Sequence, residues 1–252
     1  MIRSRLHTKL GLEEGTDVEG TIARIDHGIP VEGANAWILM ASILIASIGL
    51  DTNSQAILIG AMLISPLMSP ILGVGLGVAI YDRRLLIKAL QHFGWATGIA
   101  LGISTFYFLL TPLGEATEQM LTRTKPTILD VGVALFGGVA GIVANSRREQ
   151  SNAIPGVAIA TALLPPIATA GFGLASGNME YFLGAFFLFF LHAFFISLAT
   201  FVVVRLLRFP TKAFLDPAVE KRARRYVVAF IVLFIIPSMW IFIRVVRQTR
   251  QQ

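Results

Sequence analysis

The chain of 252 residues contains no cysteine and few charged residues. Without cysteine it can form no disulfide, no thiolate metal site and no cysteine nucleophile. Asp, Glu, Lys and Arg make up 14% of the residues, against about a quarter in a typical soluble domain. No charged residue occurs in 52–81 or in 150–179, and these runs exceed the about 20 residues that cross a hydrocarbon core. The shortage of charge therefore favours a membrane protein.

Motifs of enzyme chemistry are also absent. The sequence has no His-Glu-x-x-His, no Gly-x-Ser-x-Gly and no phosphate-binding loop ending in Gly-Lys-Ser/Thr. We therefore expect no enzyme, no catalytic residues, no resident metal and no cofactor. The pI near 10.1 does not indicate a nucleic-acid partner, because the basic residues form short clusters beside apolar segments, a pattern typical of membrane orientation.

Hydrophobic residues make up 55% of the chain, and the mean hydropathy is +0.72. They gather in long segments, which predict an all-α polytopic membrane protein with about seven transmembrane helices. The expected crossings are Ala34–Leu50, Gln55–Ile80, Leu85–Leu110, Thr127–Ala144, Asn152–Ala175, Tyr181–Leu207 and Tyr226–Ile243.

The pattern of segments and connections predicts six regions. They are a cytoplasmic or interfacial arm (1–32), a first three-helix repeat (33–111), an outer loop (112–126), a second three-helix repeat (127–207), a basic surface linker (208–225) and a C-terminal transmembrane helix with its tail (226–252).

The positions of Lys and Arg predict the orientation. If all seven segments cross, sixteen of the 21 basic residues fall on the side of the N-terminus. Cytoplasmic loops carry the excess of positive charge. We therefore expect a multi-pass protein of the cell (inner) membrane with a cytoplasmic N-terminus and an outer C-terminus.

Two of the segments resemble each other. Residues 60–79 read GAMLISPLMSPILGVGLGVA, residues 156–175 read GVAIATALLPPIATAGFGLA, and the two align without a gap, with Pro70 on Pro166. Three crossings per unit place the units in opposite orientations, so the prediction is a 3+3 inverted repeat plus one C-terminal helix. Prolines interrupt both copies, which predicts that helices two and five are broken near the membrane midplane, as in transporter binding sites.

The candidate substrate-binding residues flank these prolines. Proline removes a backbone donor and frees a carbonyl, and unwound backbone at membrane depth survives only against protein or around a wet cavity. A kinked helix whose hydroxyl groups bond to its own carbonyls is the structural alternative. The predicted site consists of Ser65, Pro66, Ser69, Pro70, Thr161, Pro165, Pro166 and Thr169.

Two further sets of residues have predicted roles in capping and in helix packing. Polar residues precede each interrupted helix and are predicted to cap it or to line a vestibule; they are Asn53, Ser54, Gln55, Gln150, Ser151 and Asn152. Gly94, Gly98 and Gly102 recur every four residues and predict a face for close helix packing.

The motifs NSQAILIGAMLISPLMSPILGVGLG and ANSRREQSNAIPGVAIATALLPPIATAGFGLA resemble the domain-of-unknown-function 389 family of prokaryotic polytopic membrane proteins. The resemblance covers roughly residues 30–205. It implies the membrane location and the extent of the fold, and it implies no particular function.

The sequence favours a membrane transporter or facilitator that moves a small solute, preferably a small anion or polar molecule, through a midplane site formed by two discontinuous helices. An oligomeric ion channel and a non-transporting membrane scaffold or assembly partner are the alternatives. The expected partners are a small solute or ion, membrane lipids and, in an oligomer, further copies of the chain.

Overall fold

A computed structural model describes residues 15–147 and 153–211, and within 153–162 it describes the backbone only. This part of the chain is helical, and its one β-bridge pairs Thr16 with Arg147. The helices are α2 (Val18–Gly28), α3 (Ala34–Asp51), α4 (Gln55–Ile64), α5 (Met68–Ala79), α6 (Arg83–Leu110), α7 (Glu118–Leu121), α8 (Ile128–Asn145), α9 (Ala153–Ala175) and α10 (Met179–Leu206).

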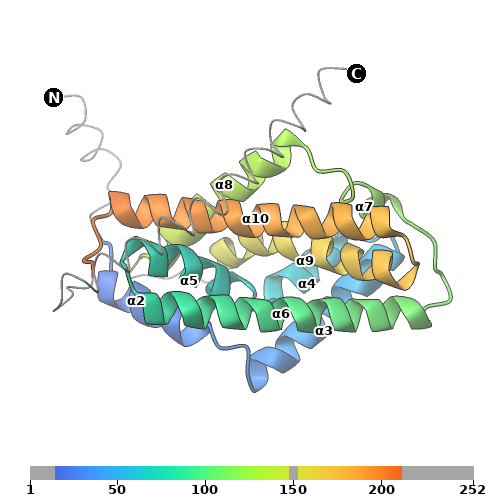
Figure 1. Ribbon diagram of the computed structural model, residues 1–252, viewed down its shortest axis with the longest axis horizontal. Helices are drawn as coiled ribbons and strands as arrows, with labels where there is room; N and C mark the ends of the chain where they lie inside the picture. Colours follow the sequence, from blue (N-terminus) through green and yellow to red (C-terminus); the bar gives the residue numbers. More distant parts are fainter. Residues whose placement is uncertain (1–14, 148–152, 212–252) are drawn as a thin grey trace.

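The two longest helices, α6 and α10, run in opposite directions along the molecule (Figure 1). Both pack against α5 and α9, while α8 packs on α10 and α3 packs on α6. Fully buried side chains of all these layers, such as Leu39, Leu72, Leu163 and Phe189, form one apolar core. The arrangement places α5 and α9 inside the bundle.

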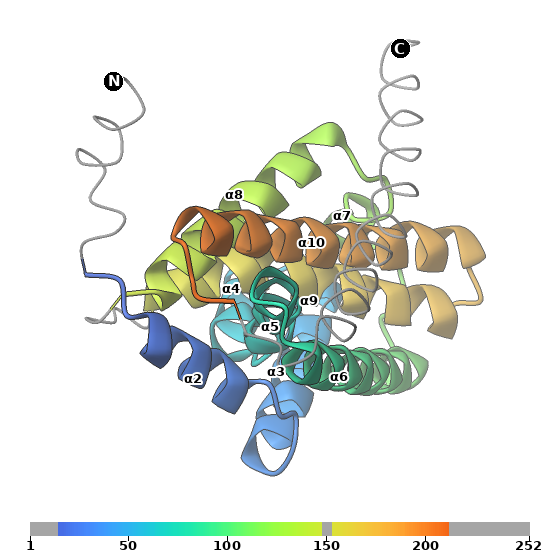
Figure 2. The same cartoon turned by 60° about the vertical axis from the view of Figure 1, so that its left-hand side comes forward.

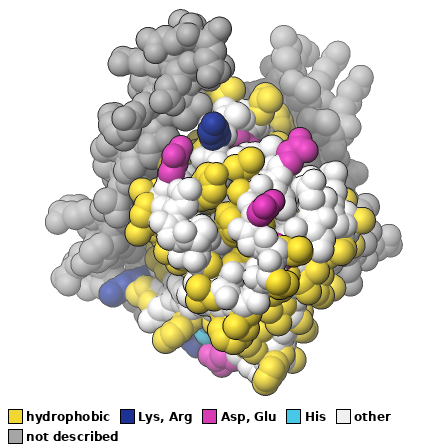
Figure 3. Space-filling model, turned by 90° about the vertical axis from the view of Figure 1, so that its right-hand side faces the viewer, with side chains coloured by type: hydrophobic (Ala, Val, Ile, Leu, Met, Phe, Trp, Pro, Cys, Tyr) yellow, Lys and Arg dark blue, Asp and Glu magenta, His cyan; other side chains and the backbone are white. Residues whose placement is uncertain are grey.

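The surface of the bundle is apolar as well. Trp37, Trp95 and Phe136 are 73%, 70% and 74% exposed, and hydrophobic side chains cover much of the end of the bundle shown in Figure 3. Exposed apolar surface of this extent marks contact with lipid or protein. Together with the apolar helices, it supports a membrane protein.

Four helices in the described part of the chain, α3, α6, α8 and α10, are long and apolar enough to cross a membrane. A fifth crossing results if α4 and α5 are one bent span. The expected boundaries of the first six segments agree to within a few residues with α3, α4–α5, α6, α8, α9 and α10. The seventh, Tyr226–Ile243, lies outside the described residues, so seven crossings stay a prediction.

The arm before the first crossing folds onto the bundle. Its helix α2 lies beside α5 (Figure 2), and Ile25 and Ile29 are 1% and 0% exposed. The sequence predicted a cytoplasmic or interfacial arm here, and the apolar face of α2 drives its docking.

Candidate functional site

The chain breaks between α4 and α5, where the two helices meet at a bend of 54°. Ser65 ends α4 in an extended conformation, with ψ of 129°. Pro66 follows, and its ring disfavours a helical conformation for the residue before it. Pro66 is therefore the physical cause of the break that the sequence predicted in the first copy.

The side chain of Ser65 lies at this break without a hydrogen bond. Its Oγ is buried and has no partner among the residues that the structure describes. A serine that kinks its own helix normally donates to a carbonyl one turn earlier; Ser42 and Ser47 of α3 do this at 2.8 Å. Because a buried hydroxyl without a partner costs free energy, Ser65 differs from a structural serine.

Ser69 and Pro70 lie in the first turn of α5, where they do not break the chain. Pro70 is the third residue of α5, a position whose N–H has no partner inside the helix, so proline costs little there. Ser69 faces α2: a Cβ added to Gly28 would lie 2.5 Å from the Ser69 hydroxyl. The last turn of α2 thus covers this side of the break.

The second copy is not broken, and the prediction of two breaks was wrong. α9 runs without interruption through Pro165 and Pro166. In the alignment Pro66, which causes the first break, corresponds to Ala162, and only the harmless Pro70 corresponds to Pro166. Packing on both sides of the prolines holds α9 together, since Leu163, Leu164, Ile167 and Ala168 are all 0% exposed.

The hydroxyl residues of the second copy lie apart from a break. Thr169 is 0% exposed, and its Oγ1 has no hydrogen-bond partner in the described part of the chain. The side chain of Thr161 lies outside the described residues. The site therefore comprises the α4–α5 break and the continuous helix α9 that packs against α4.

The polar residues before α4 act as caps. Ser54 is the N-cap residue and accepts a hydrogen bond from the Ile57 amide at 3.5 Å. Asn53 adopts a positive φ of 52°, and its Oδ1 accepts a hydrogen bond from the Gln119 amide at 3.2 Å. Gln55 is exposed in the first turn of α4. Gln150, Ser151 and Asn152 lie outside the described residues.

The glycine face predicted on α6 does not pack within the described chain. A Cβ added at Gly94, Gly98 or Gly102 would meet nothing within 4 Å. The close contacts occur at glycines of α5 and α9: a Cβ at Gly75 would lie 2.3 Å from the Ser197 carbonyl oxygen, and one at Gly171 would lie 2.0 Å from the Ser104 hydroxyl. Spacing identifies a small-residue face but not its neighbour, so packing at these three glycines stays a prediction beyond the described residues.

Positions 96 residues apart behave alike. α6 and α10 each contain 28 residues and begin at Arg83 and Met179. Each follows a residue with positive φ, Tyr81 at 58° and Gly177 at 69°. Each also starts at a side-chain cap, where Asp82 and Asn178 accept hydrogen bonds from the second and third residues after them. The two turns therefore share their backbone conformation and their capping, although their residues differ.

The contacts between the two halves are reciprocal. Gly75 of α5 approaches Thr200 of α10, and the corresponding Gly171 of α9 approaches Ser104 of α6, which corresponds to Thr200. Phe93 stacks on its own counterpart Phe189, with ring centroids 5.5 Å apart and an interplanar angle of 8°. Residues 96 positions apart thus lie side by side at this contact.

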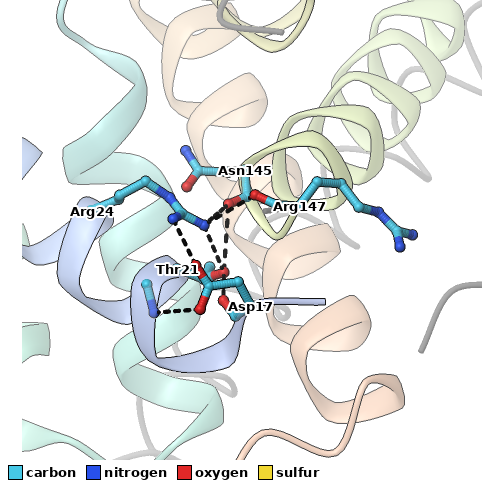
Figure 4. A network of polar contacts seen from close by, with 6 residues as sticks. Asp17, Thr21, Arg24, Asn145 and Arg147 are labelled. Atoms are coloured by element: carbon cyan, nitrogen blue, oxygen red, sulfur yellow. Dashed lines mark hydrogen bonds and ion pairs between the residues drawn. The ribbon is translucent and has the colours of Figure 1, made fainter. Parts of the chain in front are cut away.

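α2 is fastened to the end of α8 by a polar network (Figure 4). The Arg24 guanidinium pairs with Asp17 at 3.0 Å and donates to the Asn145 carbonyl at 2.9 Å and the Arg147 carbonyl at 3.4 Å. The Thr21 hydroxyl also points to the Asn145 carbonyl, at 3.4 Å. A positive charge at this position suits the negative end of the helix dipole.

The short helix α7 makes a related contact with α3. The Thr117 hydroxyl donates to the Leu50 carbonyl at 2.7 Å, near the last turn of α3. After α7, burial lowers the pKa of the Arg123 guanidinium, and the charge of Asp130 partly opposes this. The arm helix α2 thus contacts the C-terminal end of α8, and the residue before α7 contacts the C-terminal end of α3.

A cavity of about 130 Å³ lies between α5, α6 and α10. Its wall is apolar except for Ser197, whose hydroxyl already donates to the Ile71 carbonyl at 3.1 Å. Such a cavity offers nothing to a charged or polar solute. The lining residues are Ile71, Val74, Leu90, Phe93, Phe190, Ala193, Phe194 and Ser197.

The sequence reasoning overlooked Asp51. This carboxylate ends α3 and is 6% exposed; the Tyr107 and Thr111 hydroxyls donate to its Oδ2 at 3.0 and 2.6 Å. An acidic residue directly after an apolar segment was the available signal, since ionisable groups at membrane depth point to function.

A family model described as "Domain of unknown function (DUF389)" matches residues 62–198. An uncharacterized protein of Methanocaldococcus jannaschii is 28% identical over 169 residues, which is 67% of this chain and 52% of the relative. The chain therefore spans about half the length of this relative. No solved structure matches the chain.

Proposed function

The chain belongs to this DUF389 family, and from that premise we propose that it is a membrane transporter or facilitator for a small solute. The observation that carries the proposal is the unpartnered Ser65 hydroxyl at a break inside an apolar helix pair. α4 has 10 residues and α5 has 12, so the break lies about 15–18 Å from either end. That depth is near the middle of a core about 30 Å thick.

The broken helix also exposes backbone charge at this depth. The first amides of α5 and the last carbonyls of α4 both point toward the break, so it offers partial charges of either sign. The residues of the break, 65–67, carry no ionised side chain. These features suit a small anion or polar solute. The break includes no carboxylate that could bind a large cation.

We include an inverted repeat in the proposal. The shared lengths and caps of α6 and α10, the reciprocal glycine contacts and the Phe93–Phe189 stack support it. A two-fold axis in the membrane plane relates the halves of many transporters. The basic residues favour a cytoplasmic N-terminus, as proposed from the sequence.

In this proposal the described state is a closed one. The Ser65 Oγ is buried, and α2 covers the neighbouring Ser69 through Gly28. In this proposal a solute reaches the break only after α2 and α4–α5 move apart, as in alternating access.

The test uses purified protein in liposomes. A thermal-shift screen first selects the small anions and polar solutes that stabilise the protein, and uptake of those solutes is then measured. Ser65→Ala should lower saturable uptake about tenfold, because one hydrogen bond to the solute is lost. Ser42→Ala is the matched control, since the Ser42 hydroxyl bonds to its own helix. Equal uptake by the wild type and by Ser65→Ala would remove the proposed site.

A further inference from the structure

We propose that Asp51 anchors a binding site for a small monovalent cation, for which Na⁺ is the probe. The carboxylate is 6% exposed, and two hydroxyl donors hold only one of its oxygens. Tyr107 and Thr111 both donate to Oδ2. Oδ1 is buried and has no hydrogen-bond partner among the residues that the structure describes.

The position of Asp51 makes an unpaired charge costly. A buried carboxylate is normally paired with a cation or fully hydrogen-bonded. Asp51 is also the last residue of α3, where the helix dipole is negative and disfavours an anion. Within the described part of the chain, Arg24, Lys88 and His92 pair with other carboxylates, and none of these ion pairs reaches Asp51.

The corresponding end of α8 has a positively charged partner of the kind that the end of α3 lacks among the described residues. That helix ends at the neutral Asn145, and the Arg24 guanidinium donates to the Asn145 carbonyl at 2.9 Å. The helix end without a charge therefore has a cation built into the chain. Among the described residues, the helix end that carries a carboxylate has no such cation, and a bound cation would complete it in the same way.

The surrounding atoms favour a monovalent ion. The groups in contact with Asp51 offer oxygen atoms, from the Tyr107 and Thr111 hydroxyls, and oxygen is the donor that hard cations prefer. Among the described residues, no three His, Cys, Asp or Glu side chains gather as they would around a multivalent metal ion. The single negative charge of Asp51 therefore matches one positive charge. Thr52 and Asn53 beside it are exposed, which gives the ion a route from water.

Thermal stability of the purified protein tests this inference. NaCl replaces choline chloride at constant ionic strength in a mildly alkaline buffer. A cation that binds only the folded state raises the melting temperature until the site is saturated. We expect a saturable rise of about 3 °C or more in the wild type and none in Asp51→Asn, whose amide can donate where the cation would bind.

Asp130→Asn is the matched control. Asp130 caps α8 through the amide and hydroxyl of Thr127, at 2.6 and 2.8 Å, so this variant should lose stability but keep the full Na⁺ response. Thr111→Val keeps the carboxylate and loosens it, so it should need a higher Na⁺ concentration for half of the rise. Thr111→Val provides the test if Asp51→Asn does not fold.

Two results would overturn the inference. One is a wild-type melting temperature that does not depend on Na⁺; the other is a Na⁺ response that Asp51→Asn retains. If stability depends instead on pH in the wild type and not in Asp51→Asn, the group holds a proton, and the metal-cation site is wrong. None of these measurements uses solute uptake, so the inference stands or falls separately from the transport proposal.

Discussion

At the scale of single residues, the glycines of this chain divide into two kinds. Gly75 touches another helix so closely that a Cβ would lie 2.3 Å from the Ser197 carbonyl oxygen, whereas Gly98 has open space around it. Both lie inside helices, so the sequence could identify them as small residues but could not distinguish them. The difference depends on which helix faces each glycine, and that is a property of the tertiary fold.

Gly75→Ala and Gly98→Ala test this division. Gly75→Ala should lower the free energy of unfolding by about 1–3 kcal/mol, because the backbone of α10 cannot yield to the new methyl group. Gly98→Ala should leave stability unchanged or raise it by up to about 1 kcal/mol through helix propensity. Thermal denaturation in detergent measures both. Equal losses in the two variants would show that α6 packs against something through its glycine face.

Two polar side chains, Ser65 and Asp51, also differ in how far the sequence could identify them. The sequence identified Ser65 as a candidate from its place beside Pro66, and its hydroxyl has no partner among the residues that the structure describes. It did not identify Asp51, because the partners of that carboxylate, Tyr107 and Thr111, lie 56 and 60 positions further along the chain. Proximity of this kind cannot be read from spacing.

At the scale of helices, the sequence predicted positions well and continuity less well. The apolar segments predicted α3, α6, α8 and α10 to within a few residues, since segment length follows membrane thickness. The break after α4 was also predicted correctly. The break predicted in α9 was wrong, because Pro66 corresponds to Ala162 and because packing outweighs the cost of Pro165 and Pro166.

The two matching turns provide a prediction at this scale. Asp82→Ala and Asn178→Ala should each lower the free energy of unfolding by about 0.5–2 kcal/mol, since each removes the cap of a 28-residue helix. Asp82→Asn keeps a cap oxygen and should cost less than Asp82→Ala. Denaturation by heat or denaturant gives the values. A cost in one alanine variant and none in the other would show that the turns are alike in geometry but not in energy.

At the scale of the whole molecule, the reciprocal contacts unite the two halves. α5 packs on α10 as α9 packs on α6, and α3 and α8 lie on opposite sides of the bundle (Figure 1). The sequence suggested this relation through one repeated segment. It could not show that Phe93 meets Phe189, because that contact depends on how the halves are placed. The described part of the bundle contains one discontinuous helix pair, α4 and α5. In our proposal the break between them offers a polar path through an apolar interior.

Cysteine accessibility at position 65 tests that central claim most directly. The chain has no cysteine of its own, so Ser65→Cys and the control Ser42→Cys each carry a single thiol, both in apolar helices. Each variant in proteoliposomes is treated with a small, charged, membrane-impermeant thiol reagent from either side, and modification is measured by mass. We predict that residue 65 reacts and residue 42 does not. Failure of both thiols to react, from both sides, would contradict the account.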